Sequence, residues 1–242
     1  MTAIKSENEW KGPTGLPAPK LDNVRNVLFD LDGTLSDPVE GITRSIQYAL
    51  ERMGVAPPGR AGLLLHIGPP LRDTFALILQ TADGPTIERA VQLYRERFSE
   101  TGMFENVIYD GVPEMLAQLR ASRKRLFVAT SKMHAYTLRI LEHFALSGYF
   151  DAAYGSEPGG RFGEKGDLIR HMLASEGLRP EETVMVGDRK YDVAGARANA
   201  LLAAGVTYGY GSEEELTEAG ADFLCHSPLE VAELLSAERA RQ

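Results

Sequence analysis

Apolar residues first gather in one short run near the N-terminus. The chain is apolar at Val24, Val27, Leu28 and Phe29 and then turns polar at Asp30. A short apolar run that ends in a polar turn is typical of a buried β-strand. The pattern therefore predicts the first strand of a sheet here.

The segment that follows, residues 38–107, has a different period. Its apolar residues recur at helical spacing in three stretches that glycine and proline separate, with no strand pattern among them: 42–53, 71–81 and 86–100. The segment therefore predicts a group of helices inserted directly after the first strand.

Beyond Tyr109 the two periods alternate regularly. The predicted helices are 112–121, 135–144, 165–176 and 191–199, and the predicted strands are 126–129, 152–154, 183–186, 202–207 and 223–224. Strands that alternate with helices of this length form a parallel sheet with helices on both faces. The sequence predicts an α/β fold, a doubly wound, Rossmann-like parallel sheet with an inserted all-helical cap domain.

The chain divides into three predicted parts. Residues 1–22 mix charges with proline and glycine and lack the apolar run of a signal peptide, so we expect a flexible tail. Residues 23–37 and 108–242 form the expected core domain, and 38–107 form the cap. In open α/β sheets ligands bind beyond the carboxyl ends of the strands, so the polar residues that follow each strand are the candidate site.

The first strand ends in two carboxylates, Asp30 and Asp32. Alternate residues of an extended chain point the same way, so both side chains can face one crevice, where they need a cation. An ordinary acidic turn, helped by Gly33, is the alternative. A calcium-binding EF-hand loop is excluded, because its glycine and glutamate positions hold Leu35 and Gly41.

Hydroxyls and ammonium groups lie near two other predicted strands. Thr130, Ser131 and Lys132 follow the strand 126–129 and could hold phosphate oxygens, although such hydroxyls also cap helices. Lys165 begins a predicted helix, where the helix dipole disfavours a cation. Either another group requires its charge, or it is a solvated surface lysine.

Two further carboxylates follow the strand 183–186. Asp188 comes after Gly187 at a buried strand end and needs a partner, which a metal shared with Asp30 would supply. Asp192 could instead be the N-cap of the next helix. Together these groups predict a site of oxygen ligands that suits Mg²⁺ and a transferring phosphoryl group.

Composition limits the other possibilities. The 242 residues carry a net charge of −8 with no basic block, so neither a nucleic acid polymer nor a membrane surface is an expected partner. No apolar run approaches the roughly 20 residues of a membrane helix. The single cysteine, Cys225, excludes an internal disulfide and suits a reducing cytoplasm, which is the predicted location.

Four motifs occur in an order that resembles the haloacid dehalogenase superfamily of phosphatases, and the resemblance covers residues 24–235. Residues 30–34, Asp-Leu-Asp-Gly-Thr, match the first motif and Thr130 the second. Lys165 matches the third motif, and residues 187–188 with Asp192 match the fourth.

The resemblance implies a role for each matched residue. Asp30 would be the nucleophile, which forms an aspartyl-phosphate, and a magnesium ligand. Asp32 would protonate the leaving oxygen, later activate water, and bind magnesium through its backbone carbonyl. The dehalogenases that resemble this fold lack the second aspartate and magnesium, so Asp32 makes carbon–halogen cleavage an unexpected activity.

The other motifs are implied to surround the phosphoryl group and the metal. Thr130, together with Ser131 and Lys132, would bind phosphoryl oxygens, and Lys165 would neutralise the phosphate and the nucleophile. Asp188 would ligate magnesium directly. Gly33 and Asp192 would have supporting roles, the latter toward the metal or Lys165.

The predicted cap resembles the family's helical cap, which closes over the site and selects the substrate. Its loop 66–72 is similar to the substrate loop of the phosphoglycolate phosphatase and bacterial 5′-nucleotidase group, so His66, Gly68 and Arg72 are candidate substrate contacts. Arg72 could equally be a solvated residue. Residues 187–192 and 208–211 also resemble this group, which favours a nucleoside 5′-monophosphate as substrate.

Other functions remain open at this stage. They are hydrolysis of 2-phosphoglycolate, hydrolysis of pyrophosphate, and phosphoryl transfer to a sugar as in the similar β-phosphoglucomutases. A non-catalytic, phosphate-sensing scaffold would be expected to lack a catalytic residue, and every such position is filled here. The expected partner is a small phosphorylated metabolite, and the protein is expected to be a monomer or homodimer.

Overall fold

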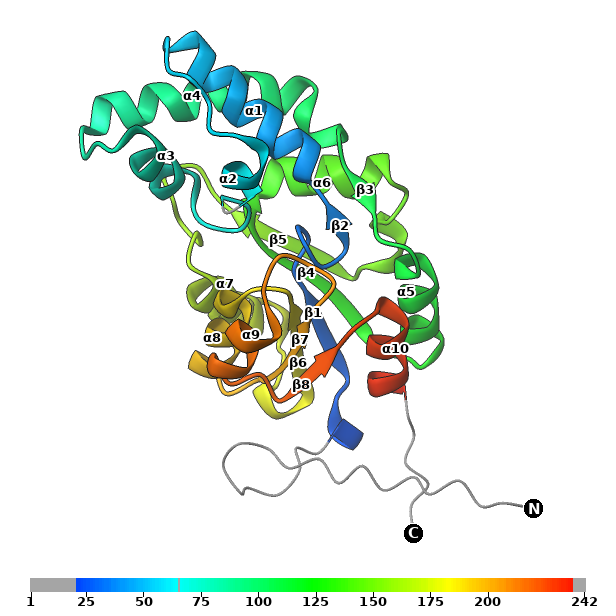
Figure 1. Cartoon of the computed structure of the whole chain (residues 1–242). Helices are drawn as coiled ribbons and strands as arrows, with labels where there is room; N and C mark the ends of the chain where they lie inside the picture. The colour runs from blue at the N-terminus through cyan, green and yellow to red at the C-terminus, as the bar shows by residue number, and fades with distance from the viewer. Residues whose placement is uncertain (1–20, 65, 237–242) are drawn as a thin grey trace.

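The computed structural model describes residues 21–64 and 66–236. A parallel sheet lies between two groups of helices, and a further group of helices stands over one end of it (Figure 1). The predicted tail, residues 1–22, lies outside the described residues except for Leu21 and Asp22, which begin a 3₁₀ turn at Leu21–Asn23.

The sheet has the strand order β5-β4-β1-β6-β7-β8, and all neighbouring strands are parallel. Its strands are β1 (Asn26–Phe29), β4 (Arg125–Met133), β5 (Ala152–Ser156), β6 (Thr183–Gly187), β7 (Leu202–Val206) and β8 (Phe223–Cys225). β1 is central, and all four of its residues are buried. The predicted doubly wound α/β fold is thus confirmed.

Alternate residues of β1 pack against different helices. Val27 and Phe29 belong to the apolar cluster that includes α5, α6 and α10, whereas Leu28 belongs to the cluster that includes α7, α8 and α9. The helices are α5 (Val112–Ala121), α6 (His134–His143), α7 (Lys165–Glu176), α8 (Lys190–Ala198), α9 (Glu213–Glu218) and α10 (Pro228–Ser236). Both faces of the sheet are therefore covered, as the continuous apolar strands require.

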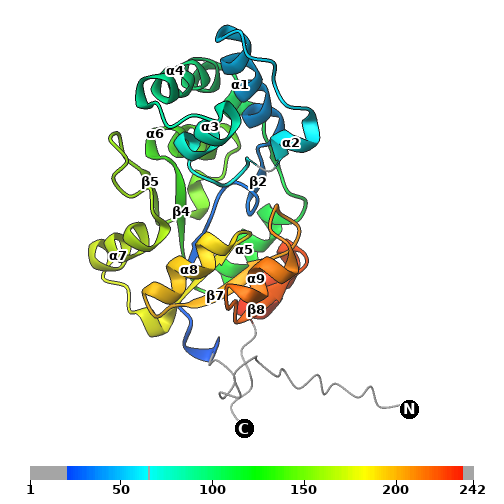
Figure 2. The same ribbon diagram turned by 60° about the vertical axis from the view of Figure 1, so that its left-hand side comes forward.

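A helical layer, defined here as α1 to α4, gathers over the sheet (Figure 2). Its members are α1 (Val39–Arg52), α2 (Arg60–Leu64), α3 (Leu71–Leu79) and α4 (Gly84–Glu100), and a 3₁₀ turn, Gly102–Phe104, follows them. α4 begins earlier than predicted, because Asp83 caps it by accepting a hydrogen bond from the Thr86 N–H and Pro85 fits the first turn.

Two short strands lead the chain into and out of the helical layer. β2 (Ser36–Asp37) and β3 (Val107–Ile108) pair antiparallel, with Ser36 opposite Ile108 and Asp37 opposite Val107. We call this pair the connecting ribbon. The prediction of no strand in 38–107 was wrong at Val107, because a strand of two residues is too short to produce an alternating pattern.

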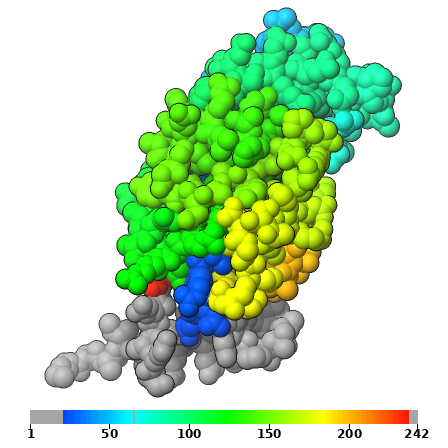
Figure 3. Space-filling view, turned by 180° about the vertical axis from the view of Figure 1, so that it is seen from behind, coloured from blue at the N-terminus to red at the C-terminus, as the bar shows by residue number. Residues whose placement is uncertain are grey.

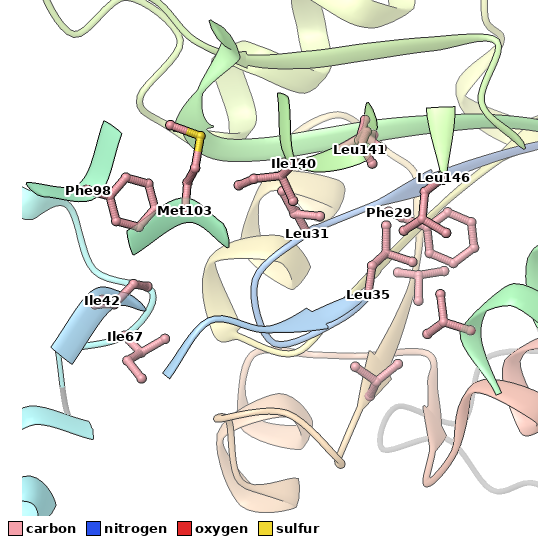
Figure 4. Packing of buried hydrophobic residues seen from close by; sticks show 14 of the residues in the cluster. Phe29, Leu31, Leu35, Ile42, Ile67, Phe98, Met103, Ile140, Leu141 and Leu146 are labelled. Atoms are coloured by element: carbon pink, nitrogen blue, oxygen red, sulfur yellow. The ribbon is translucent and has the colours of Figure 1, made fainter. Parts of the chain in front are cut away.

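Apolar side chains join the helical layer to the sheet. Figure 4 shows Ile42, Ile67 and Phe98 near one end of a cluster that continues through Leu31 to Phe29. Seen from behind, the helical layer forms one end of the molecule and rests on the elements that follow it in the chain (Figure 3). Burial of this shared apolar surface stabilises the observed position of the layer.

Two differences from the predicted elements bear on the site. β4 extends to Met133, with irregular register between Ala129 and Met133, so Thr130 belongs to the strand and not to a loop. The short helices α2 and α9 and the C-terminal helix α10 were not predicted.

None of the helices within residues 21–64 and 66–236 combines the length and apolar character needed to span a membrane.

Candidate active site

Asp30 occupies the carboxyl end of the central strand. Its N–H donates to the carbonyl of Val186 at 2.9 Å, which continues the pairing of β1 with β6. Its Oδ1 accepts from the Leu31 N–H at 2.7 Å and lies 3.1 Å from the Lys165 Nζ. The carboxylate is therefore held in one orientation beside a positive charge.

Lys165, the first residue of α7, is buried among oxygens. Its side chain is 3% exposed, and its Nζ lies 2.7 Å from Asp192 Oδ1 and 2.8 Å from the carbonyl oxygen of Ala129. Burial alone would lower the pKa of Lys165, but the charges of Asp192 and Asp30 outweigh it and the pKa is raised. The alternative of a solvated lysine is wrong, and the carboxylates explain a cation at a helix start.

Two glycines make room for this pair of charges. A Cβ on Gly195 would lie 2.8 Å from Lys165 Cγ, and a Cβ on Gly187 would lie 2.2 Å from Asp192 Cγ. Asp192 is the third residue of α8, and its Oδ2 accepts from the N–H of Arg189, the N-cap. The alternative of Asp192 as the N-cap is therefore wrong.

Three carboxylates converge at the ends of β1 and β6. Oxygens of Asp30, Asp188 and Asp192, which we call the carboxylate triad, lie within 4.8 Å of one another. Burial, followed by the charges of the neighbouring carboxylates, raises the pKa of Asp188, and burial raises the pKa of Asp192 to about 6 although Lys165 opposes it. Buried carboxylates at this spacing repel one another, and their all-oxygen donor set fits a hard divalent cation such as Mg²⁺.

Asp188 is fixed on two sides. Its Oδ1 accepts from the Thr34 hydroxyl at 3.3 Å, and its Oδ2 accepts from the Tyr210 N–H at 2.9 Å. Gly33 has φ of +83°, and a Cβ there would lie 2.1 Å from Asp188 Oδ2. Gly33 therefore satisfies both a left-handed turn and a close approach to this carboxylate.

Asp32 lies outside the triad and faces a different cation. Its Oδ2 pairs with the Lys132 Nζ at 2.8 Å, and that ammonium also lies 4.5 Å from the ring centroid of Phe98. Asp32 Oδ1 is buried and has no hydrogen-bond partner among the described residues. Burial raises the pKa of Asp32 although Lys132 opposes it. This free oxygen can give or take a proton, and the structure places Lys132, a predicted substrate contact, against it.

Two hydroxyls follow the buried part of β4. Thr130 is 2% exposed, and its Oγ1 accepts from the Lys132 N–H at 3.3 Å. Ser131 donates through its hydroxyl to the carbonyl of Gly163 at 3.2 Å. Both residues line the same cavity as Asp30.

The cavity has a volume of about 260 Å³ and lies between the sheet and the helical layer. The structure thus brings predicted residues from both parts of the chain together around it: Asp30, Asp32, Thr130, Ser131, Lys132, Lys165, Asp192, His66, Gly68 and Arg72. Arg72 also pairs with Glu88 at 2.6 Å and remains 65% exposed, so a carboxylate already partners its guanidinium.

An aromatic and cationic wall was not predicted. Tyr94, Arg95 and Phe98 of α4 and Tyr136 of α6 line the cavity, and the ring centroids of Phe98 and Tyr136 are 5.5 Å apart. The signal for the α4 part was present, since Val91, Tyr94, Arg95 and Phe98 share one face of a helix.

The contact that Arg189 makes with the helical layer was also not predicted. Its guanidinium donates to the carbonyl of Ile67 at 2.7 Å, in the loop before α3, and to Glu215 at 2.9 Å. Gly68, with φ of +104°, allows this approach, because a Cβ there would lie 2.8 Å from the guanidinium. The residue beside Asp188 therefore joins the sheet to the loop of the predicted cap.

Fold and site together define an α/β phosphoryl-transfer enzyme with carboxylates at the strand ends. The chain belongs to the haloacid dehalogenase-like hydrolase family, whose model matches residues 27–206.

Two of three similar relatives carry phosphatase-type names, and the third is named a tyrosine-protein kinase. The chain is 50% identical over 193 residues to a 5′-nucleotidase of Pseudomonas aeruginosa. The matched region covers 79% of this chain and 86% of that protein. It is 38% identical to the tyrosine-protein kinase PtkA of Mycobacterium tuberculosis over 83% of this chain and 68% of that one. It is 29% identical to a phosphoglycolate phosphatase of Chromobacterium violaceum over 89% and 98% of the two chains.

A solved structure has the same fold. The crystal structure of a predicted phosphatase from Clostridium acetobutylicum superimposes with a TM-score of 0.83 at 42% identity, over 87% of this chain and 97% of that one. The protein is accordingly a hydrolase of the phosphatase type.

Proposed function

We propose that the protein is a Mg²⁺-dependent phosphomonoesterase that acts on a small phosphorylated metabolite through a phosphorylated Asp30. The observation that carries the proposal is the arrangement around Asp30. One buried ammonium, Lys165, and two buried carboxylates, Asp188 and Asp192, lie next to it, and within the described part of the chain Asp32 Oδ1 has no hydrogen-bond partner.

In the first step the Asp30 carboxylate attacks phosphorus and the bond from phosphorus to the leaving oxygen breaks. Asp32 gives its proton to that oxygen, and its raised pKa favours the protonated form that this step needs. Thr130 and Lys165 bind the phosphoryl oxygens. The alcohol leaves with the proton from Asp32.

In the second step water attacks phosphorus of the acyl phosphate, Asp32 takes up the proton of that water, and the bond to Asp30 breaks. Inorganic phosphate leaves, and Asp30 is again a carboxylate. Asp30, Asp188 and the backbone carbonyl of Asp32 would hold Mg²⁺, which would offset the charge shared by the carboxylates and the phosphoryl group.

A nucleoside 5′-monophosphate is the substrate class that we favour. Tyr94, Phe98 and Tyr136 give the cavity an apolar aromatic wall, and Arg95 adds a cation beside it. Such a wall fits a planar, partly polar leaving group. The name of the Pseudomonas aeruginosa relative, 5′-nucleotidase, supports the same choice.

A comparison of Asp30→Asn with the wild type tests the chemistry. With Mg²⁺ we expect the wild type to release phosphate from p-nitrophenyl phosphate and from nucleoside monophosphates, and Asp30→Asn to lose at least about 10³-fold in kcat. Asp167→Asn changes an exposed carboxylate on α7 and is the matched control. A protein-bound phosphate sensitive to hydroxylamine should form on the wild type alone. Equal activity of Asp30→Asn would refute the proposal.

A substrate screen separates this proposal from the other functions of the family. Nucleoside monophosphates, 2-phosphoglycolate, pyrophosphate and hexose phosphates are compared by kcat/KM, and sugar products are checked for isomerisation. The highest kcat/KM on a nucleotide supports our choice, whereas isomerised sugar without free phosphate would indicate a phosphotransferase.

A further inference from the structure

The loop 208–211, which follows β7, contacts both the carboxylate triad and the connecting ribbon. The steps proposed above do not use it, and its residues do not line the cavity. Its sequence, Tyr-Gly-Tyr-Gly, nevertheless places two phenols and two glycines at the junction of the sheet and the helical layer.

The glycines bring the loop against Asp188. A Cβ on Gly209 would lie 2.4 Å from Asp188 Cβ and 2.2 Å from the Gly33 carbonyl oxygen, and a Cβ on Gly211 would lie 2.0 Å from the Asp188 carbonyl oxygen. Between them the N–H of Tyr210 donates to Asp188 Oδ2 at 2.9 Å. The backbone of the loop therefore fixes one oxygen of this carboxylate.

The side chain of Tyr210 reaches the other way, to the connecting ribbon. Its hydroxyl donates to Oδ1 of Asp37, the second residue of β2. The same oxygen accepts from the N–H of Val39, the first residue of α1, at 3.0 Å. One residue thus joins a carboxylate of the triad to the point where the chain enters the helical layer.

Tyr208 strengthens the same junction. Its hydroxyl donates to the carbonyl of Thr34 at 3.0 Å, and the Thr34 hydroxyl donates to Asp188. Its ring packs edge-on against Tyr109, at 5.2 Å between centroids, and Tyr109 directly follows β3. The loop therefore contacts the chain next to both strands of the ribbon.

We propose that Tyr210 is a positioning residue that couples the orientation of Asp188 to the position of β2, and through β2 to the helical layer. A divalent cation on Asp188 would then favour the arrangement in which the helical layer covers the cavity. By thermodynamic reciprocity, the covered arrangement binds the cation more tightly by the same factor. The inference rests on the proposed function, because it assigns a cation to Asp188.

Tyr210→Phe tests the coupling, since it removes the hydroxyl and keeps the ring and the N–H. Mg²⁺ binding to the full chain is measured by calorimetry without substrate, and we expect affinity to fall about fivefold or more. Hydrogen exchange of the α1 amides is measured with and without Mg²⁺. We expect Mg²⁺ to protect these amides in the wild type and to protect them less in Tyr210→Phe.

Two further variants control the test. Tyr154→Phe removes another phenol-to-carboxylate hydrogen bond, to Glu176 at 2.7 Å, and should leave Mg²⁺ affinity unchanged. Asp37→Asn weakens the same hydrogen bond by changing its acceptor. Because both changes act on one contact, the double variant Tyr210→Phe/Asp37→Asn should bind Mg²⁺ about as tightly as whichever single variant binds it less tightly. Thermal midpoints establish that each variant is folded.

The outcomes separate the coupling from the metal site. Wild-type Mg²⁺ affinity in both Tyr210→Phe and Asp37→Asn would overturn the coupling alone, as would additive losses in the double variant. A wild-type protein that binds no Mg²⁺ would overturn the proposed metal chemistry and the coupling together.

Discussion

The carboxylates around Asp30 lower the stability of the folded protein, because they lie close together in a largely buried site. Asp30 and Asp192 share the Lys165 ammonium, whereas Asp188 is fully buried and forms no ion pair among the described residues. Burial raises the pKa of Asp188, so the folded protein resists the charge that a metal ligand needs. Sites built for function commonly carry such a cost.

Asp188→Asn should therefore stabilise the metal-free protein by roughly 1 kcal/mol at neutral pH. The amide oxygen can still accept from the Tyr210 N–H, and the amide nitrogen can donate to the Thr34 hydroxyl. Denaturant unfolding in a chelator measures the gain. Mg²⁺ should stabilise the wild type and not the variant, and a variant less stable than the wild type without metal would contradict the expectation.

The same residue predicts a pH dependence. A carboxyl whose pKa is higher in the folded state binds its proton more tightly there, so metal-free stability falls as pH rises above the unfolded pKa of about 3.9 towards the raised folded value. Asp188→Asn should flatten this fall. Unfolding free energies from pH 5 to 8 in a chelator provide the test, and identical slopes for the two proteins would refute it.

Lys165→Met should destabilise the protein by about 3 kcal/mol, because it leaves the half-buried Asp30 and the buried Asp192 without their ammonium. Lys190→Met, at an exposed position in the first turn of α8, should change stability by less than about 0.5 kcal/mol. Mg²⁺ should recover part of the loss in Lys165→Met. Equal unfolding midpoints for the two variants would show that Lys165 does not neutralise the carboxylates.

At the scale of elements, a clear period made prediction possible. The bounds of α5 and α7 match the predicted 112–121 and 165–176, because each helix combines a clear apolar face with a glycine at one end. α9 was missed since it is acidic and buries only Leu216. The extension of β4 was missed because Thr130, Ser131 and Lys132 interrupt its apolar pattern, and these residues line the cavity.

Gly209→Ala tests the loop as an element. Its methyl group would meet the Gly33 carbonyl and Asp188 at distances that require backbone movement, so we expect a loss of about 2 kcal/mol in stability together with weaker Mg²⁺ binding. Gly148→Ala is the matched control, because no atom of the described residues lies within 4 Å of its Cβ position. Unfolding curves and calorimetry measure both effects, and a stable Gly209→Ala with normal Mg²⁺ affinity would contradict the close packing.

At the scale of the whole molecule, the cavity lies between two parts of the chain. The residues of one part could be predicted from the sequence better than those of the other. The sheet half could be predicted, because Asp30, Lys165 and Asp188 each lie at the end of a strand or the start of a helix. The other half depends on contacts between distant segments, such as that of Arg189 with Ile67, 122 residues apart. No local pattern encodes such a contact.

Arg189→Ala should remove a contact between the end of β6 and the loop before α3. Losing the bond to the Ile67 carbonyl frees the loop that carries His66 and Gly68, so we expect kcat/KM to fall about tenfold, mainly through KM. Arg197→Ala is the matched control, since that guanidinium on α8 binds Gly220 and Asp222 away from the cavity. Steady-state kinetics decide, and equal kcat/KM for the two variants would refute the expectation.

The connecting ribbon has a consequence for how such enzymes change. Asp37 and Val107 face each other, so the segment between them leaves and re-enters the ribbon at neighbouring points about 5 Å apart. A segment of different length could be inserted between these two residues without moving β2 and β3 apart. The ribbon is thus a point at which the helical layer, and with it the α4 side chains that line the cavity, could be exchanged while the residues around Asp30 stay in place.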